Sequence, residues 1–146
     1  MTNLDRLMIE RECERLVSLY THYADFGEAE RVAELFARDA VWAVGPIRFE
    51  SQEKIRQMMR GRQEMAGRRS RHVCTNLQID VLDENNASGL VYLTLYRHDF
   101  EGPEREAGEV MQTAPTAVGE YRDRFVRTDA GWRFSERHAA LAFGKL

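Results

Sequence analysis

Apolar side chains recur at three- and four-residue steps along the first part of the chain, which is the spacing of one face of an α-helix. They are Leu4, Leu7, Met8, Leu16, Leu19, Tyr20 and Tyr23. Gly27 interrupts this series, and glycine favours the end of a helix over its interior. The pattern therefore predicts an amphipathic helix that ends at Asp25.

Two more helices and a short strand are expected before Gly67. Helical spacing resumes over residues 28–36 and ends by Asp39, and an apolar strand over residues 40–44 stops at Gly45-Pro46. Ser51 can cap the third helix through its hydroxyl. The apolar face of this third helix consists of Ile55, Met58 and Met59.

After Gly67 the apolar spacing changes to the alternation of β-strands. Strands are expected over residues 71–82, 87–100, 116–128 and 131–143, with polar segments over residues 83–86, 101–113 and 128–131. Without a bulge in the last strand, Phe134, Glu136 and His138 would share one face. Helices followed by long antiparallel strands predict an α+β fold, with helices on one face of the sheet and a cavity between them. No repeat or linker interrupts the chain, so residues 1–146 are expected to form a single domain.

Composition excludes several classes of protein. The chain has 146 residues and a formal net charge of -3, so it lacks the basic surface of a nucleic-acid-binding protein. Its apolar runs are shorter than the roughly 20 residues that span a bilayer, and its first residues lack a secretion signal. We therefore expect a cytoplasmic protein that binds neither nucleic acid nor membrane. Cys13 and Cys74 are expected to be buried reduced thiols, and the four histidines lack metal-ligand spacing, so no metal site is expected.

Asp25 and His72 are the residues that most directly suggest chemistry. Asp25 closes the first predicted helix, and His72 lies at the start of the strand after Gly67. A carboxylate bonded to one imidazole nitrogen sets the tautomer and makes the other nitrogen a better base. A compact α+β domain can bring the two together and so equip the protein for proton transfer. Two structural alternatives stay open: a hydrogen bond of His72 to a backbone carbonyl, and a role of Asp25 in stabilising the helix end.

The order of motifs resembles the SnoaL-like branch of the nuclear transport factor 2-like superfamily. The motifs are Tyr-x-x-x-x-Asp at residues 20–25, Leu-Phe-Ala-Arg-Asp-Ala-Val-Trp at 35–42, Arg-His-x-x-x-Asn at 71–76 and Gly-Trp-Arg-Phe at 131–134. The resemblance runs from about Glu10 to Phe143. It implies a cone-shaped, strongly bent antiparallel sheet wrapped around N-terminal helices, with an internal pocket.

The resemblance also implies a set of catalytic residues. Scytalone dehydratase and bile acid 7α-dehydratase, both of this superfamily, carry an Asp–His pair at the places of Asp25 and His72. The bile acid enzyme also has a tyrosine at the place of Tyr20. The tyrosine that precedes the aspartate in scytalone dehydratase is Ala24 here, and the basic aspartate of ketosteroid isomerases corresponds to Val44. The implied catalytic residues are therefore Asp25, His72 and Tyr20.

The activity that the resemblance implies is that of a lyase or isomerase without a cofactor, similar to a dehydratase. Its substrate would be a hydrophobic polycyclic or aromatic hydroxy-carbonyl compound, such as a steroid or polyketide. Two alternatives remain: a non-catalytic small subunit of an aromatic-ring-hydroxylating dioxygenase, and a hydrophobic-ligand-binding module. A homo-oligomer, either dimer or trimer, is expected because apolar residues on the outer face of the sheet need cover.

Further residues are candidates for the cavity and its entrance. The candidates for substrate contact are Trp42, Met59, Asn76 and Tyr96. Trp42, Met59 and Tyr96 can equally be core residues, because such side chains dominate protein interiors. The basic segment from Arg60 to Arg71 is either a solvated loop or a docking patch for a carboxylate or a coenzyme A thioester. Its arginines are Arg60, Arg62, Arg68, Arg69 and Arg71.

Overall fold

The computed structural model describes residues 1–101 and 114–146. Its first helix, α1 (Asn3–Asp25), has a recognisable stabilising feature at each end. The Thr2 hydroxyl accepts a hydrogen bond from the backbone N–H of Asp5, and the Asp5 carboxylate accepts one from the backbone N–H of Thr2. Gly27 follows the helix with φ 81°, a conformation that glycine adopts without steric cost. The predicted first helix and its end at Asp25 are confirmed. The polar segment expected at 101–113 lies outside the described residues, apart from Glu101.

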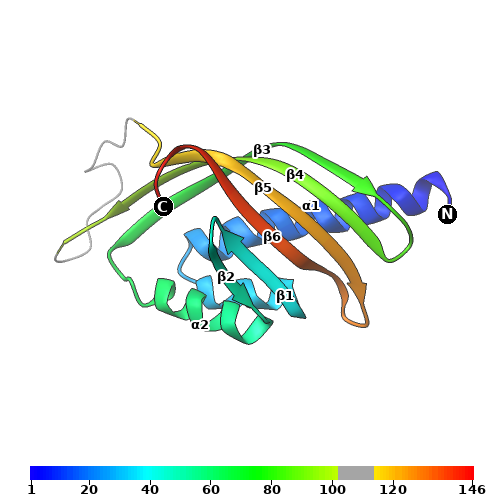
Figure 1. Cartoon of the computed structure of the whole chain (residues 1–146), viewed down its shortest axis with the longest axis horizontal. Coiled ribbons are helices and arrows are strands. Elements are labelled where there is room, and N and C mark those ends of the chain that lie inside the picture. Colours follow the sequence, from blue (N-terminus) through cyan, green and yellow to red (C-terminus); the bar gives the residue numbers. More distant parts are fainter. Residues whose placement is uncertain (102–113) are drawn as a thin grey trace.

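The strands of the described residues form one open, six-stranded sheet in the order β2-β1-β6-β5-β4-β3 (Figure 1). Their bounds are β1 (Phe36–Val44), β2 (Ile47–Glu50), β3 (Arg68–Val81), β4 (Asn86–Asp99), β5 (Ala117–Thr128) and β6 (Gly131–Gly144). Strands β3 to β6 pair as the predicted antiparallel meander. Strand β1 pairs in parallel with β6, and the long stretch of chain between them meets the requirement of a parallel pair for a long connection.

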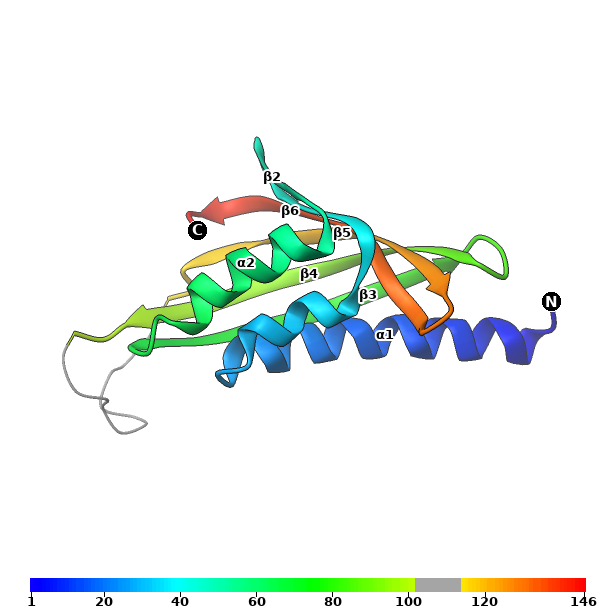
Figure 2. The same ribbon diagram turned by 90° about the horizontal axis from the view of Figure 1, so that it is seen from below.

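The helices pack against one face of this curved sheet (Figure 2). With α1, they are the 3₁₀ helix η1 (Ala29–Leu35) and helix α2 (Gln52–Gln63), which Ser51 caps as predicted. Buried residues of all three, such as Cys13, Val32 and Ile55, form one core with Val91 and the other inward-facing residues of the sheet. The predicted α+β fold, a bent sheet around N-terminal helices, is confirmed. Within residues 1–101 and 114–146, no helix is both long and apolar enough to cross a membrane.

The chain between α1 and α2 departs from its prediction. The segment expected to be helical as far as Asp39 is a 3₁₀ helix that ends at Leu35, and β1 begins at Phe36 instead of residue 40. Phe36 pairs with Phe134 of β6 and is 1% exposed, so tertiary packing outweighs the local helical spacing. The sequence does not predict β2, because this strand is four residues long and mostly exposed.

A β-bulge in β6 reverses the alternation of its side chains. The pairing of β6 with β5 slips by one position after Phe134, which leaves Ser135 as an extra residue. After the bulge, Arg137 is fully buried, whereas Glu136 and His138 contact each other at the outer face. In a regular strand, one face would carry Phe134, Glu136 and His138. Because one inserted residue shifts the alternation by one position, Phe134 instead lies in the core, and Glu136 and His138 lie at the outer face.

Candidate active site

Asp25 and His72 are in direct contact, although α1 carries the first and β3 the second. Asp25 Oδ1 lies 2.6 Å from His72 Nδ1, and the His72 backbone N–H donates to Asp25 Oδ2 at 2.8 Å. Both side chains are nearly buried, with exposed fractions of 8% for His72 and 4% for Asp25. The carboxylate therefore holds the imidazole through Nδ1, which leaves Nε2 as the nitrogen that can exchange a proton with another molecule.

Ser70 and Arg62 support this carboxylate from behind. Ser70 Oγ donates to Asp25 Oδ1 at 2.7 Å, and Arg62 Nη2 donates to Ser70 Oγ at 2.7 Å. Burial raises the pKa of the Asp25 carboxyl, but the hydrogen bonds and charge of His72 and the hydrogen bond of Ser70 outweigh it, so the pKa lies below its ordinary value. Asp25 is therefore ionised at neutral pH. Sequence reasoning missed Ser70, although a hydroxyl two residues before His72 shares its strand face.

A cavity of about 310 Å³ opens beside His72, between the sheet and helix α2. Much of its wall is apolar and includes Val44, Met58 and Leu95. In the described part of the chain, His72 Nε2 makes no hydrogen bond, so it can bond a molecule in the cavity. The cavity brings together four of the residues predicted for the site, namely Tyr20, Trp42, Met59 and His72.

The Tyr20 hydroxyl lies at this cavity, and its oxygen accepts a hydrogen bond from Trp42 Nε1 at 3.0 Å. The Tyr121 ring lies beside the Tyr20 ring, with centroids 5.7 Å apart. Because the oxygen already accepts, the Tyr20 proton is available to an acceptor in the cavity. Burial raises the pKa of Tyr20 above its ordinary value, so the hydroxyl keeps its proton at neutral pH. Tyr20 is therefore suited to donate to an oxygen that gains negative charge.

Arg137 is a buried cation beneath these tyrosines that sequence reasoning missed. Its guanidinium donates two hydrogen bonds of 2.8 Å to Asp123, and both side chains are 0% exposed. The guanidinium carbon lies 4.3 Å from the ring centroid of Tyr20 and 3.9 Å from that of Tyr121. This positive charge lowers the pKa of Tyr20 against the effect of burial. The sequence carries no signal for this pair, because the regular hairpin register would set Asp123 opposite Glu136, and only the bulge at Ser135 brings Arg137 there.

The structure does not place Asn76 or Tyr96 at the cavity. Tyr96 follows Leu95 on β4, and because strand side chains alternate, it lies at the outer face, where it lines a separate shallow hollow. Asn76 is exposed at a β-bulge of β3, and its φ is 53°. Asparagine adopts this left-handed conformation more readily than most residues. The backbone conformation therefore accounts for Asn76 without a substrate contact.

Replacement of Asn76 tests this explanation. We expect Asn76→Ala to lower the free energy of unfolding by about 1 kcal/mol, because the left-handed conformation costs an ordinary L-residue roughly 1–2 kcal/mol. Asn76→Gly should be close to neutral in stability and should leave turnover unchanged. Urea unfolding followed by circular dichroism measures the stability of both variants. A stable Asn76→Gly protein with lost turnover would instead assign the side chain to the substrate.

The arginines of the basic segment are divided among different roles. Arg60 and Arg68 form ion pairs at 2.8 Å with acidic residues of other elements, and the Arg71 guanidinium lies over an aromatic ring. Of these arginines, Arg62 and Arg68 line the cavity. The alternative of a solvated loop is wrong, because most of these residues belong to the end of α2 or the start of β3.

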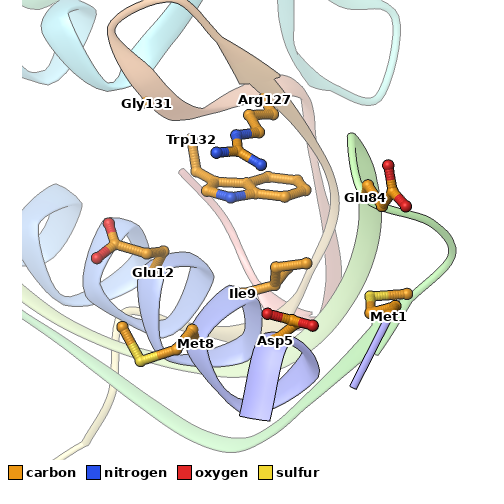
Figure 3. Close-up of a pocket in the computed structure, with 9 residues that line it drawn as sticks. All are labelled: Met1, Asp5, Met8, Ile9, Glu12, Glu84, Arg127, Gly131 and Trp132. Carbon is orange, nitrogen blue, oxygen red and sulfur yellow. The ribbon is translucent and has the colours of Figure 1, made fainter. Parts of the chain in front are cut away.

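A larger hollow of about 550 Å³ lies far from His72, beside the N-terminal half of α1 (Figure 3). Figure 3 shows Glu12 and Glu84 on opposite sides of this hollow, with Trp132 between them. The carboxylate of Asp5, which also lines it, is bonded in the cap of α1. Among the described residues, no histidine lines this hollow. It therefore lacks the acid–imidazole pair that marks the cavity beside His72.

Comparisons with known proteins show the family and the fold of the chain. The model of the SnoaL-like domain family matches residues 5–138. Comparison with curated proteins gives no match. The chain is similar in structure to a candidate scytalone dehydratase from Novosphingobium aromaticivorans, with 21% identity, a TM-score of 0.80, and coverage of 97% of this chain and 89% of that one.

Two further solved structures are similar. One is the hexachlorocyclohexane dehydrochlorinase LinA-type3 from Novosphingobium barchaimii, with 19% identity, a TM-score of 0.78, and coverage of 99% of this chain and 93% of that one. The other is a candidate aromatic ring hydroxylase from Novosphingobium aromaticivorans, with 17% identity, a TM-score of 0.73, and coverage of 94% and 91%. At these identities the likeness shows the shared fold.

Proposed function

Since the chain belongs to the SnoaL-like domain family, we propose that it is a lyase or isomerase of the dehydratase kind that works without a cofactor. The observation that carries this proposal is the Asp25–His72 pair, bonded at 2.6 Å beside the cavity. Two of the similar structures bear the names of a dehydratase and a dehydrochlorinase, enzymes that eliminate water or hydrogen chloride. Removal of a proton from carbon is the step in such eliminations that an imidazole base serves.

In the proposed reaction, His72 Nε2 removes a proton from the carbon next to a substrate carbonyl group. The electron pair of the broken C–H bond moves toward the carbonyl, so negative charge gathers on its oxygen. Tyr20 donates a hydrogen bond to that oxygen. The ionised Asp25 stabilises the imidazolium through Nδ1. The negative charge on the substrate oxygen is thus stabilised by Tyr20, and the positive charge on His72 is stabilised by Asp25.

The same histidine completes the elimination. Protonated His72 gives its proton to the departing hydroxyl, the C–O bond breaks, a carbon–carbon double bond forms and water leaves. His72 returns to the neutral form, and the step needs neither oxidant nor reductant. If the substrate has no leaving group, return of the proton to a different carbon gives an isomerisation.

The cavity limits the size of the substrate. Its volume of about 310 Å³ lies at the lower end of the roughly 300–1,000 Å³ common for small-molecule sites. Trp42 and Met59 supply apolar surface on which a flat ring can lie. We therefore propose an aromatic or alicyclic hydroxy-carbonyl compound of one or two rings ahead of a larger polycyclic one.

Deuterium exchange tests the base directly. The protein is incubated in D₂O with a panel of aromatic and alicyclic hydroxy-carbonyl compounds, and mass spectrometry records deuterium uptake at carbon and loss of water. Enzyme-dependent uptake or loss supports the proposal. Tight binding with neither change indicates a ligand-binding module, and co-purification with a larger iron-containing chain indicates a dioxygenase subunit.

Removal of the Tyr20 hydroxyl should slow the reaction. We expect Tyr20→Phe to lower kcat by about 10², the lower end of the loss seen when one donor to a developing oxyanion is removed. Tyr23→Phe is the matched control, because Tyr23 lies on the same helix and its hydroxyl accepts from Arg31 instead of lining the cavity. Equal kcat values for the two variants would remove Tyr20 from the mechanism.

A further inference from the structure

The cavity beside His72 holds positive charge that the proposed proton transfer does not use. Three arginines line it, namely Arg62, Arg68 and Arg97. Arg68 donates two hydrogen bonds of 2.8 and 2.9 Å to Asp99, which neutralises it. Among the described residues, Arg62 and Arg97 form no ion pair with a carboxylate, and Arg62 reaches Asp25 only through Ser70. The whole chain carries a net charge of -3, so this positive excess is a local feature.

Both unpaired arginines are partly withdrawn from water. Burial lowers the pKa of Arg97 below its ordinary value, and the charges of Arg68 and Arg62 lower it further, against the smaller opposing effect of Asp99. Burial likewise lowers the pKa of Arg62, with Arg68 adding to this effect, and the opposing effects of Tyr20, Asp25 and Tyr121 do not cancel it. A cation held away from water beside other cations is destabilised unless an anion joins it. The site therefore favours an anionic guest.

Arg97 is also held in place for such a role. Its backbone N–H donates to Thr116 Oγ1 at 3.0 Å, which ties the end of β4 to the start of β5. Side chains alternate along β4, so Arg97 shares the inner face with Leu95. Arg97 therefore lines the cavity from the inner face of β4, while its backbone is fixed by Thr116.

We propose that Arg97 and Arg62 bind a carboxylate of the substrate, so that the cavity takes an aromatic or alicyclic carboxylic acid. This inference rests on the proposed function and names its substrate class. A guanidinium presents paired N–H donors that match the two oxygens of a carboxylate. The apolar wall formed by Met59 and Leu95 receives the ring.

The register of β3 and β4 sets where the carboxylate lies relative to the base. His72 faces Leu95, and Arg97 faces Ser70, so His72 and Arg97 are diagonal neighbours on one face of the sheet. Diagonal neighbours have Cα atoms about 7–8 Å apart. A carboxylate on Arg97 and a reacting carbon at His72 therefore fit on the same small ring system.

Calorimetric titration with a matched pair of probes tests the inference. 2-Naphthoate and 2-naphthamide have nearly the same shape and differ in charge. We expect the wild-type protein to bind the acid at least about tenfold more tightly than the amide, which is the scale of a charged hydrogen bond. Arg97→Gln should abolish this preference, and Arg97→Lys should keep part of it. A wild-type protein that binds the two probes equally, or binds neither, would overturn the inference.

Two further variants separate this inference from the proposed function. Arg60→Gln removes the same charge from α2 at an exposed position paired with Glu30, so the preference for the acid should stay unchanged. If Arg60→Gln and Arg97→Gln lose the preference for the acid equally, the preference reflects the overall charge of the protein, and this result would contradict a specific carboxylate site. His72→Gln should keep the preference for the acid while losing deuterium exchange. Exchange that survives in His72→Gln would count against the proposed function alone, and a lost preference in Arg97→Gln would still support the carboxylate site.

Discussion

His72→Ala should lower kcat, or the rate of deuterium uptake at the acidic carbon, by roughly 10²–10⁴, which is the usual contribution of a positioned general base. The side chain is held by Asp25 at 2.6 Å, and among the described residues no other histidine lines the cavity. The fold should persist, because in the variant the Asp25 carboxylate keeps its hydrogen bonds from the backbone N–H of residue 72 and from Ser70 Oγ. Mass spectrometry of exchange in D₂O and circular dichroism measure the two properties in the same preparation.

His138 provides the matched control for this experiment. It is a second strand histidine with a carboxylate partner, since its Nε2 lies 3.1 Å from Glu136 Oε2, but the pair lies on the outer face of the sheet. His138→Ala should therefore retain the wild-type rate. If His72→Ala and His138→Ala are equally active, His72 is not the base, and the proposed reaction fails with it.

Arg137→Met should lower the free energy of unfolding by about 3–5 kcal/mol, because loss of one partner leaves the charge of the other buried in the core without compensation. The remaining carboxylate of Asp123 would lie at a position where both side chains are 0% exposed. Breakage of a buried ion pair costs far more than removal of both members, because a well-packed apolar pair leaves no unpaired charge. The double variant Arg137→Met, Asp123→Leu should therefore recover most of the lost stability, as measured by urea unfolding.

The Arg60–Glu30 pair is the control for this prediction. Its two groups approach to 2.8 Å at the surface, where water competes for both. Arg60→Gln should change the free energy of unfolding by less than about 1 kcal/mol. An Arg137→Met protein that loses no more stability than Arg60→Gln, or a double variant no more stable than Arg137→Met, would contradict the account of a buried pair.

Part of the candidate site could be predicted because its residues occupy elements with strong local signals. The apolar spacing of α1 ends at Gly27, which places Asp25 at the helix end, and alternation begins at the strand that carries His72. The supporting groups carry no such signal. Ser70 and Arg62 reach Asp25 from the start of β3 and from α2, so their role exists only once those elements meet.

Local spacing and turn residues determined where α1, α2 and the meander strands run, since these patterns repeat within each element. The inward or outward direction of several side chains depended on contacts between strands. Ser135 enters β6 as an extra residue, and Arg137 consequently points into the core while His138 points outward. Because strand side chains alternate with a period of two, a single inserted residue reverses the positions that follow it up to the next bulge, and only pairing with the neighbouring strand reveals where that insertion lies.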